Sequence, residues 1–140
     1  MDWLGMAVAA AFAVVAMLHF YWALGGTVGI DKIVPTLGGL PLFAPYAWLM
    51  TTVALIASVL AGLALFLGLF ASGSPLRPYA AILGCTVGGL LCLRAIGEFR
   101  YMGFFKRVRD SSYAGWDTWL YSPFYLVAGI AFVTLSANRI

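Results

Sequence analysis

Four apolar stretches of about twenty residues or more constrain the fold of this chain more than any other feature. They span about 3–24, 45–71, 79–99 and 118–138 of the 140 residues, and each is long enough to cross roughly 30 Å of hydrocarbon as a helix. Hydrophobic residues make up 64% of the chain and charged residues 9%, whereas soluble domains carry about 25% charged residues. We therefore predict a single membrane-embedded domain, 1–140.

Helices are the predicted form of these stretches. Backbone amides in lipid must bond within their own segment or within a closed barrel, and the stretches lack the period-two alternation of barrel strands. The first stretch differs from a secretory signal peptide, because it begins with Asp2 instead of an early Lys or Arg and no small-residue cleavage site follows it. The predicted fold is an all-α integral membrane protein, a four-transmembrane-helix bundle.

The three predicted loops differ in composition. The 72–78 turn (SGSPLRP) is short and polar. Loop one, 25–44, is rich in glycine and proline yet mostly apolar, so we expect it to pack on the end of the bundle or dip into the membrane interface. Loop three, 100–117, mixes basic and aromatic residues, as interfacial segments do.

The start of the fourth span has two interpretations. Asp117 could cap a helix that begins at Thr118 and kinks at Pro123. Alternatively, Ser122 is the N-cap and Pro123 takes the first helical position, where its missing amide costs nothing. We favour the second, which gives a shorter span, 122–138, and makes 117–121 an interfacial step.

The basic residues predict an orientation. Loops one and three carry five of them, against two on the opposite side: Lys32, Arg100, Lys106, Arg107 and Arg109 against Arg77 and Arg139. By the positive-inside rule, loops one and three are cytoplasmic and both termini lie outside.

Nearly all ionisable residues gather at one end of the predicted bundle. Spans joined by short loops alternate in direction, so the end of span one, loop one, the end of span three and the start of span four lie together. This end holds His19, Asp31, Lys32, Arg94, Glu98, Arg100 and Asp117. Polar groups at membrane depth are costly and commonly functional, which makes this end the predicted site.

Arg94 and Glu98 are four residues apart and share one helical face, which Tyr101 continues. They could form a self-neutralising pair that fixes span three against its neighbours. Alternatively, Arg94 or Arg100 anchors an anionic or carbonyl headgroup, and Glu98 or His19 carries a proton. Both interpretations stay open, and His19 and Glu98 are the candidate catalytic residues. Asp117 is expected to order a helix end or a loop.

Most aromatic residues also lie toward this end. A plain aromatic belt would populate both interfaces, so we predict a cap of rings of the kind that lines an amphipathic-ligand pocket, with an interfacial collar as the alternative. The candidate ligand-binding residues are His19, Tyr21, Trp22, Arg94, Glu98, Arg100, Tyr101 and Asp117.

Several other sites are not expected. One histidine, and carboxylates without ligand spacing, predict no metal site and no cofactor. Basic residues divided among loops form no stripe for nucleic acid. Cys85 and Cys92 are too far apart along one helix to pair with each other.

Small residues recur at four-residue spacing, which permits close helix contact in lipid. The pairs are Gly84 with Gly88, Ser58 with Gly62, and Ala7 with Ala11. We favour packing within the chain over dimerisation, although a homo-oligomer stays open.

Two stretches resemble a known family. HFYWALGG at 19–26 and RAIGEFRYMGFFKRVRDSSYAGWDTWLYSP at 94–123 are similar to the signature stretches of small bacterial four-helix membrane proteins, domain-of-unknown-function family 3995. The resemblance covers the whole chain. It implies a four-helix fold in the bacterial cytoplasmic membrane and implies no activity.

Three functions compete. We favour a pocket for an amphipathic small molecule, such as a lipid or quinone, and leave open whether the protein is an enzyme. The alternative is a non-catalytic accessory subunit or assembly factor that binds a membrane-protein partner. Small-solute transport needs a polar path, whereas the other half of every span is apolar.

Overall fold

The structure is a computed structural model that describes residues 2–38, 40–42, 44–97, 103–107, 109 and 112–138. Helices account for most of these residues. The elements in chain order are α1 (Asp2–Ala23), η1 (Ile30–Lys32), β1 (Thr36–Leu37), β2 (Leu40–Pro41), α2 (Ala47–Leu65), η2 (Phe66–Phe70), α3 (Arg77–Ile96), α4 (Ser112–Trp116), η3 (Asp117–Tyr121) and α5 (Ser122–Ala137).

The predicted all-α architecture with four membrane-spanning helices is confirmed. Four helices are long and apolar enough to cross a bilayer: Asp2–Ala23, Ala47–Phe70, Arg77–Ile96 and Ser112–Ala137. Within the described residues, strand structure is limited to the short antiparallel pair β1 and β2 in loop one, where Thr36 pairs with Pro41 and Leu37 with Leu40.

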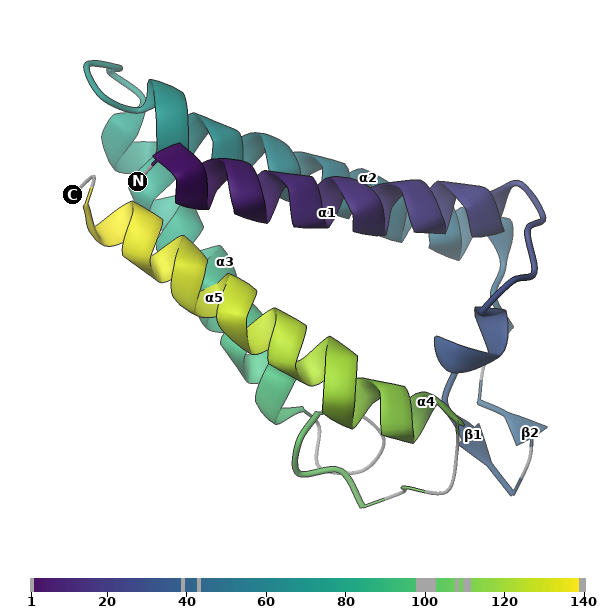
Figure 1. Cartoon of the computed structure of the whole chain (residues 1–140). Coiled ribbons are helices and arrows are strands. Elements are labelled where there is room, and N and C mark those ends of the chain that lie inside the picture. Colours follow the sequence, from purple (N-terminus) through teal and green to yellow (C-terminus); the bar gives the residue numbers. More distant parts are fainter. Residues whose placement is uncertain are drawn as a thin grey trace.

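The helices form two hairpins that diverge (Figure 1). In hairpin one, α1 packs along α2 and η2; in hairpin two, α3 packs along α5. The hairpins meet near the two termini and separate toward loops one and three. The bundle is therefore a wedge, closed at one end and open at the end where the ionisable residues were predicted to gather.

Glycines bring the helices of hairpin two into close contact. A Cβ atom on Gly88 would lie 2.7 Å from the carbonyl oxygen of Gly129, and one on Gly129 would lie 2.7 Å from that of Gly88. Gly84 is also buried, and a Cβ atom there would meet the side chains of Ser136 on α5 and Leu67 on η2. Gly84 and Gly88 thus pack within the chain, as predicted, whereas Ser58 and Gly62 are exposed.

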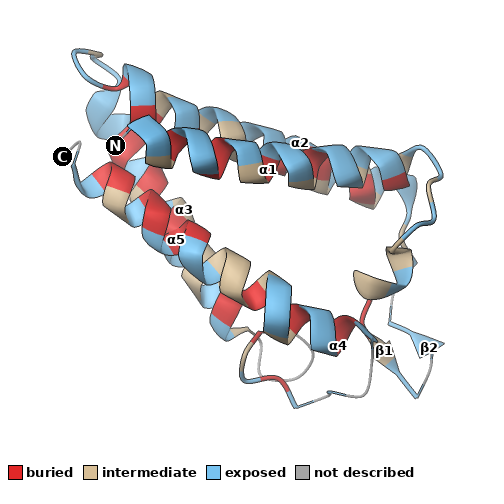
Figure 2. Cartoon of the chain, in the orientation of Figure 1, coloured by how far each residue is buried: buried red, intermediate tan, exposed pale blue. Residues whose placement is uncertain are grey.

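Aromatic rings join the two hairpins. The Phe12 ring of α1 lies 5.4 Å, centroid to centroid, from Phe124 and 6.0 Å from Phe132 of α5. Phe132, Leu135 and Leu67 are fully buried nearby. Figure 2 shows the buried residues along the contacts between helices and the exposed ones on the outer faces, as expected for helices that face lipid.

The fourth span begins earlier than predicted. Its helix runs without a break from Ser112 to Ala137, so the favoured start at Ser122 and the alternative start at Thr118 are both wrong. The reason is a π turn over 117–121, in which the amide of Ser122 donates to the carbonyl oxygen of Asp117. Pro123 lacks an amide hydrogen and disrupts a regular helix; the wider turn accommodates it and lets the helix continue.

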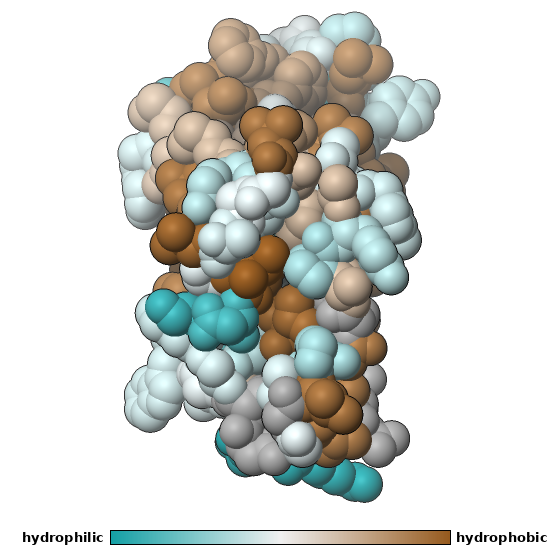
Figure 3. Space-filling model, turned by 90° about the vertical axis from the view of Figure 1, so that its right-hand side faces the viewer, coloured by the Kyte–Doolittle hydropathy of each residue, from teal (hydrophilic) through white to brown (hydrophobic). Residues whose placement is uncertain are grey.

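Loop one closes the open end of hairpin one and keeps an apolar surface. Val28, Leu37 and Leu40 are exposed. In the view onto this end, apolar patches lie among smaller hydrophilic ones (Figure 3). This mixed surface is the kind that suits a membrane interface.

Replacing Gly88 with Ala tests the contact between α3 and α5. The added methyl group would lie 2.7 Å from a backbone oxygen, so the helices must separate, and we expect the free energy of unfolding to fall by about 1–3 kcal/mol. Gly89→Ala is the matched control, because its methyl group would meet nothing within 4 Å and alanine favours a helix. Thermal unfolding in one detergent compares them; equal midpoints would contradict the close contact.

Candidate functional site

A cavity of about 740 Å³ occupies the open part of the wedge. Both hairpins contribute to its walls: aliphatic side chains of α1 and α2 lie on one side, and aromatic side chains of α4, η3 and α5 lie on the other. Its lining includes Ala11, Val14, Leu18, His19, Trp22, Lys32, Val53, Arg94, Tyr113, Trp116, Tyr121, Phe124 and Tyr125. The walls are mostly apolar, and the polar groups are few, which is the usual composition of a small-molecule site.

His19 lines the cavity from α1 with one ring nitrogen uncommitted. Its Nδ1 lies 2.8 Å from the carbonyl oxygen of Val15. Since a carbonyl only accepts, Nδ1 carries the hydrogen. The ring packs edge-on against Trp22, 5.0 Å between centroids. Among the described residues Nε2 has no hydrogen-bond partner, so it is the nitrogen that can accept or, when protonated, donate a hydrogen bond.

Arg94 reaches the cavity from the last turn of α3. Its Nη2 donates to the Tyr113 hydroxyl, 2.8 Å away, and to Oδ1 of Asp117, 3.0 Å away. The guanidinium carbon lies 4.8 Å from the centre of the Tyr125 ring. Its Nη1 is buried and has no hydrogen-bond partner within the described part of the chain. Arg94 is therefore held in place while part of its donor capacity is unused.

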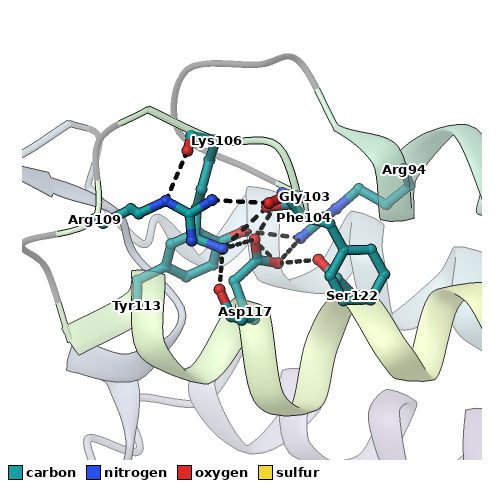
Figure 4. Close-up of polar contacts among 9 residues, drawn as sticks. Arg94, Gly103, Phe104, Lys106, Arg109, Tyr113, Asp117 and Ser122 are labelled. Atoms are coloured by element: carbon teal, nitrogen blue, oxygen red, sulfur yellow. Dashed lines mark hydrogen bonds and ion pairs between the residues drawn. The ribbon is translucent and has the colours of Figure 1, made fainter.

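Asp117 holds this region together (Figure 4). The residue is fully buried. Its Oδ2 accepts a hydrogen bond from the amide of Gly103, 2.6 Å away, and lies 3.2 Å from Nζ of Lys106. Its Oδ1 accepts from Ser122 Oγ, 3.1 Å away, as well as from Arg94. The carboxylate thus connects α3, loop three and the fourth span, which matches the expected loop-ordering role.

Loop three is bonded to this cluster through Lys106. The ammonium group also donates to the Gly103 carbonyl oxygen, 3.0 Å away, and to the Thr118 hydroxyl. Arg109 donates to the carbonyl oxygens of Lys106 and Phe104, at 3.0 and 2.9 Å. These basic residues therefore have structural partners in addition to any effect on orientation.

Loop one crosses the mouth of the wedge to reach hairpin two. The Tyr121 hydroxyl donates to the carbonyl oxygen of Lys32 at 2.8 Å, and Nζ of Lys32 lies 5.0 Å from the centre of a Trp116 ring. On hairpin one, Trp22 Nε1 donates to the carbonyl oxygen of Val28 at 2.8 Å. Lys32 is thereby placed at the edge of the cavity.

The structure brings some of the predicted site residues together. His19, Trp22 and Arg94 line one cavity, whereas Asp117 lies behind Arg94 and does not line it. Tyr21 does not line it either; its hydroxyl accepts a hydrogen bond from the amide of Val28, at 3.3 Å. Glu98, Arg100 and Tyr101 lie outside the described residues, so the predicted pairing of Arg94 with Glu98 stays a prediction.

The aromatic residues divide into two groups instead of forming one cap. Trp22 and Tyr113 are buried beside the cavity, whereas Trp48 and Trp119 are 67% and 85% exposed. The ligand pocket and the interfacial collar stay alternative predictions for these residues.

Five contributors were not among the candidate ligand-binding residues: Lys32, Tyr113, Tyr121 and Tyr125 at the cavity, and Lys106 as the partner of Asp117. Tyr113, Asp117 and Tyr121 are four residues apart in succession, a spacing that places them on one helical face. This four-residue spacing could have identified Tyr113 and Tyr121 as neighbours of Asp117, provided that the helix was taken to include Ser112.

Asp117→Asn removes the charge that compensates Arg94 and Lys106 while nearly preserving side-chain shape. We expect the free energy of unfolding to fall by about 3–5 kcal/mol, because two cations lose their buried partner. Adding Lys106→Met should recover part of the loss by removing one unpaired cation. Thermal unfolding in one detergent measures the cycle, with the exposed Asp31→Asn as control. Independent, additive losses would show that Asp117 and Lys106 do not interact.

Comparison with known proteins supports the resemblance seen in the sequence. The model of family DUF3995, described as protein of unknown function, matches residues 12–132. Searches of curated proteins and of solved structures give no significant match. The matched range covers most of the chain, including the whole lining of the cavity except Ala11, and we conclude that the chain belongs to the DUF3995 family.

Proposed function

We propose that this protein binds an amphipathic small molecule of the membrane, such as a lipid or quinone, between its two hairpins. The observation that carries the proposal is a cavity of about 740 Å³ beside His19 and Arg94. Cavities of roughly 300–1,000 Å³ are typical of small-molecule sites. A molecule with an apolar body and one polar end matches a lining that is apolar apart from one polar edge.

The bonding of His19 supports a ligand-facing role over a structural one. Its side chain bonds to the carbonyl oxygen of Val15 in its own helix, and not to the neighbouring helix among the described residues. A histidine that locks two helices would bond across them. A leucine side chain would pack equally well in this apolar wall. We therefore attribute the polar ring of His19 to a ligand in the cavity.

The orientation is also part of the proposal. The chain lies in the bacterial cytoplasmic membrane with loops one and three in the cytoplasm and both termini outside, as the basic residues predict. The cavity then opens at the cytoplasmic end of the bundle.

Filling the cavity tests the proposed function directly. Ala11 lines the cavity, whereas Ala13 is exposed on the same helix. We expect native mass spectrometry of the detergent-purified protein to find a retained small molecule in the wild type and in Ala13→Phe, and little or none in Ala11→Phe. A wild-type protein that carries no small molecule and instead copurifies with one other membrane protein would favour the accessory-subunit function.

His19→Phe separates binding from stability. Because its only hydrogen bond among the described residues is to its own helix, we expect the unfolding midpoint to stay equal or rise, since an apolar ring replaces a half-buried polar one. The retained small molecule should be lost. A fall of about 1–3 kcal/mol in the free energy of unfolding, without loss of any bound molecule, would instead assign His19 a structural role.

Cysteine labelling tests the orientation. In a background without Cys85 and Cys92, Ser112→Cys should resist a membrane-impermeant thiol reagent on intact cells, and Ser74→Cys should react. Both positions are accessible at opposite ends of the bundle, so each controls for the other. The reverse pattern would invert the orientation.

A further inference from the structure

The charges around the cavity restrict the ligand beyond its amphipathic character. Two cationic side chains, Arg94 and Lys32, contribute to the lining. Asp117, the carboxylate that pairs with Arg94, is fully buried and is enclosed by Arg94, Lys106, Ser122 and the Gly103 amide. Asp31 is exposed and does not line the cavity. The described lining is therefore cationic at its polar edge.

We propose that the ligand, if the proposed function holds, is an anionic amphiphile whose carboxylate or phosphate headgroup binds between Arg94 and Lys32. A quinone, whose headgroup is neutral, would leave this positive charge uncompensated. The carboxylate and the phosphate headgroup share the chemistry that is recognised here, which is an oxyanion on an apolar chain.

The cluster around Asp117 supports this inference through its balance of charge. Among the described residues of this cluster, Arg94 and Lys106 supply two positive charges and Asp117 supplies one negative charge. A carboxylate shared by two cations compensates each incompletely, and Arg94 is the one of the two that also contacts the cavity. A guanidinium in a low-dielectric site favours a second anion.

Lys32 supplies the second positive charge from loop one. The Tyr121 hydroxyl holds its backbone carbonyl at 2.8 Å, and its ammonium group lies over the Trp116 ring. Within the described residues it forms no ion pair. An ammonium ion held against an aromatic face at a cavity mouth keeps its charge available for an incoming anion.

The remaining lining indicates a single apolar chain. Below the polar edge the cavity is bordered by Val14, Leu18, Val53 and Phe124, with no further charged residue of the described chain among its walls. A volume of about 740 Å³ lies in the range of sites for one compact molecule. One chain with one charged end therefore matches both the size and the placement of charge.

Binding of matched probes tests the inference. Delipidated protein in a nonionic detergent is titrated with palmitate, methyl palmitate, oleoyl lysophosphatidate and a short-chain ubiquinone. We expect palmitate to bind at least 10-fold more tightly than its neutral ester, because only the carboxylate can form a charge-assisted contact with Arg94 and Lys32. The ratio of palmitate to lysophosphatidate affinity then separates the carboxylate from the phosphate source.

Lys32→Gln is the variant that leaves the Asp117 cluster intact. The bond from Tyr121 goes to the backbone of Lys32, so it survives the substitution. We expect the Kd for palmitate to rise about 10-fold and the Kd for methyl palmitate to stay unchanged. Arg107→Gln removes an exposed positive charge that does not line the cavity, and it should change neither value. Equal thermal unfolding of the two variants checks that both are folded.

Different failures have different meanings. If palmitate and its ester bind equally, or ubiquinone binds more tightly than both, and Ala11→Phe abolishes that binding, the anionic inference is overturned while the proposed function stands. If none of the four probes binds the wild-type protein, both are overturned.

Discussion

A carboxylate that is fully shielded at the edge of a membrane must have its charge compensated by the protein itself, and Asp117 obtains that compensation from three segments. Arg94 comes from the end of α3, Lys106 and the Gly103 amide come from loop three, and Ser122 comes from the next turn of its own helix. Leaving one partner of such a pair unpaired costs several kcal/mol, on the order of 3–5. The segments are thereby held in one arrangement, and the same guanidinium that reaches Asp117 is placed over Tyr125 at the cavity.

The shape of the wedge follows from where small and large residues lie. Within hairpin two, Gly88 and Gly129 let α3 and α5 touch through their backbones, and Phe12 of hairpin one packs against Phe124 and Phe132 of hairpin two. Toward the open end, described contacts between hairpins are made by loop one, through Lys32 with Tyr121 and Trp116. The cavity lies between these two regions, and His19 and Arg94 line it from the two hairpins.

The features that depend on hydropathy and chain alternation could be predicted from the sequence. The four spans follow from their apolar length, and the gathering of His19 and Arg94 at one end follows from the alternating direction of the helices. The partner of Arg94 could not be derived, because sequence spacing indicates only neighbours on one helix, whereas Asp117 approaches from another. Pro123 was misinterpreted because a missing amide is compatible both with a helix start and with a position after a π turn. The divergence of the hairpins has no local sequence signal.

The closed end of the wedge also bears on whether a solute could cross the membrane through this protein. The lining of the cavity extends to Ala11 on α1 and Tyr125 on α5, and Phe12, Phe132 and Leu135 fill the interior of the bundle with buried apolar side chains. A transported polar solute would need partners for its hydrogen bonds along that half of the path. The described interior there offers the hydroxyl of Ser136, which is buried without a hydrogen-bond partner among the described residues, and no charged side chain. In the proposed function, an amphiphile would lie in this cavity with its polar end at the open end of the wedge.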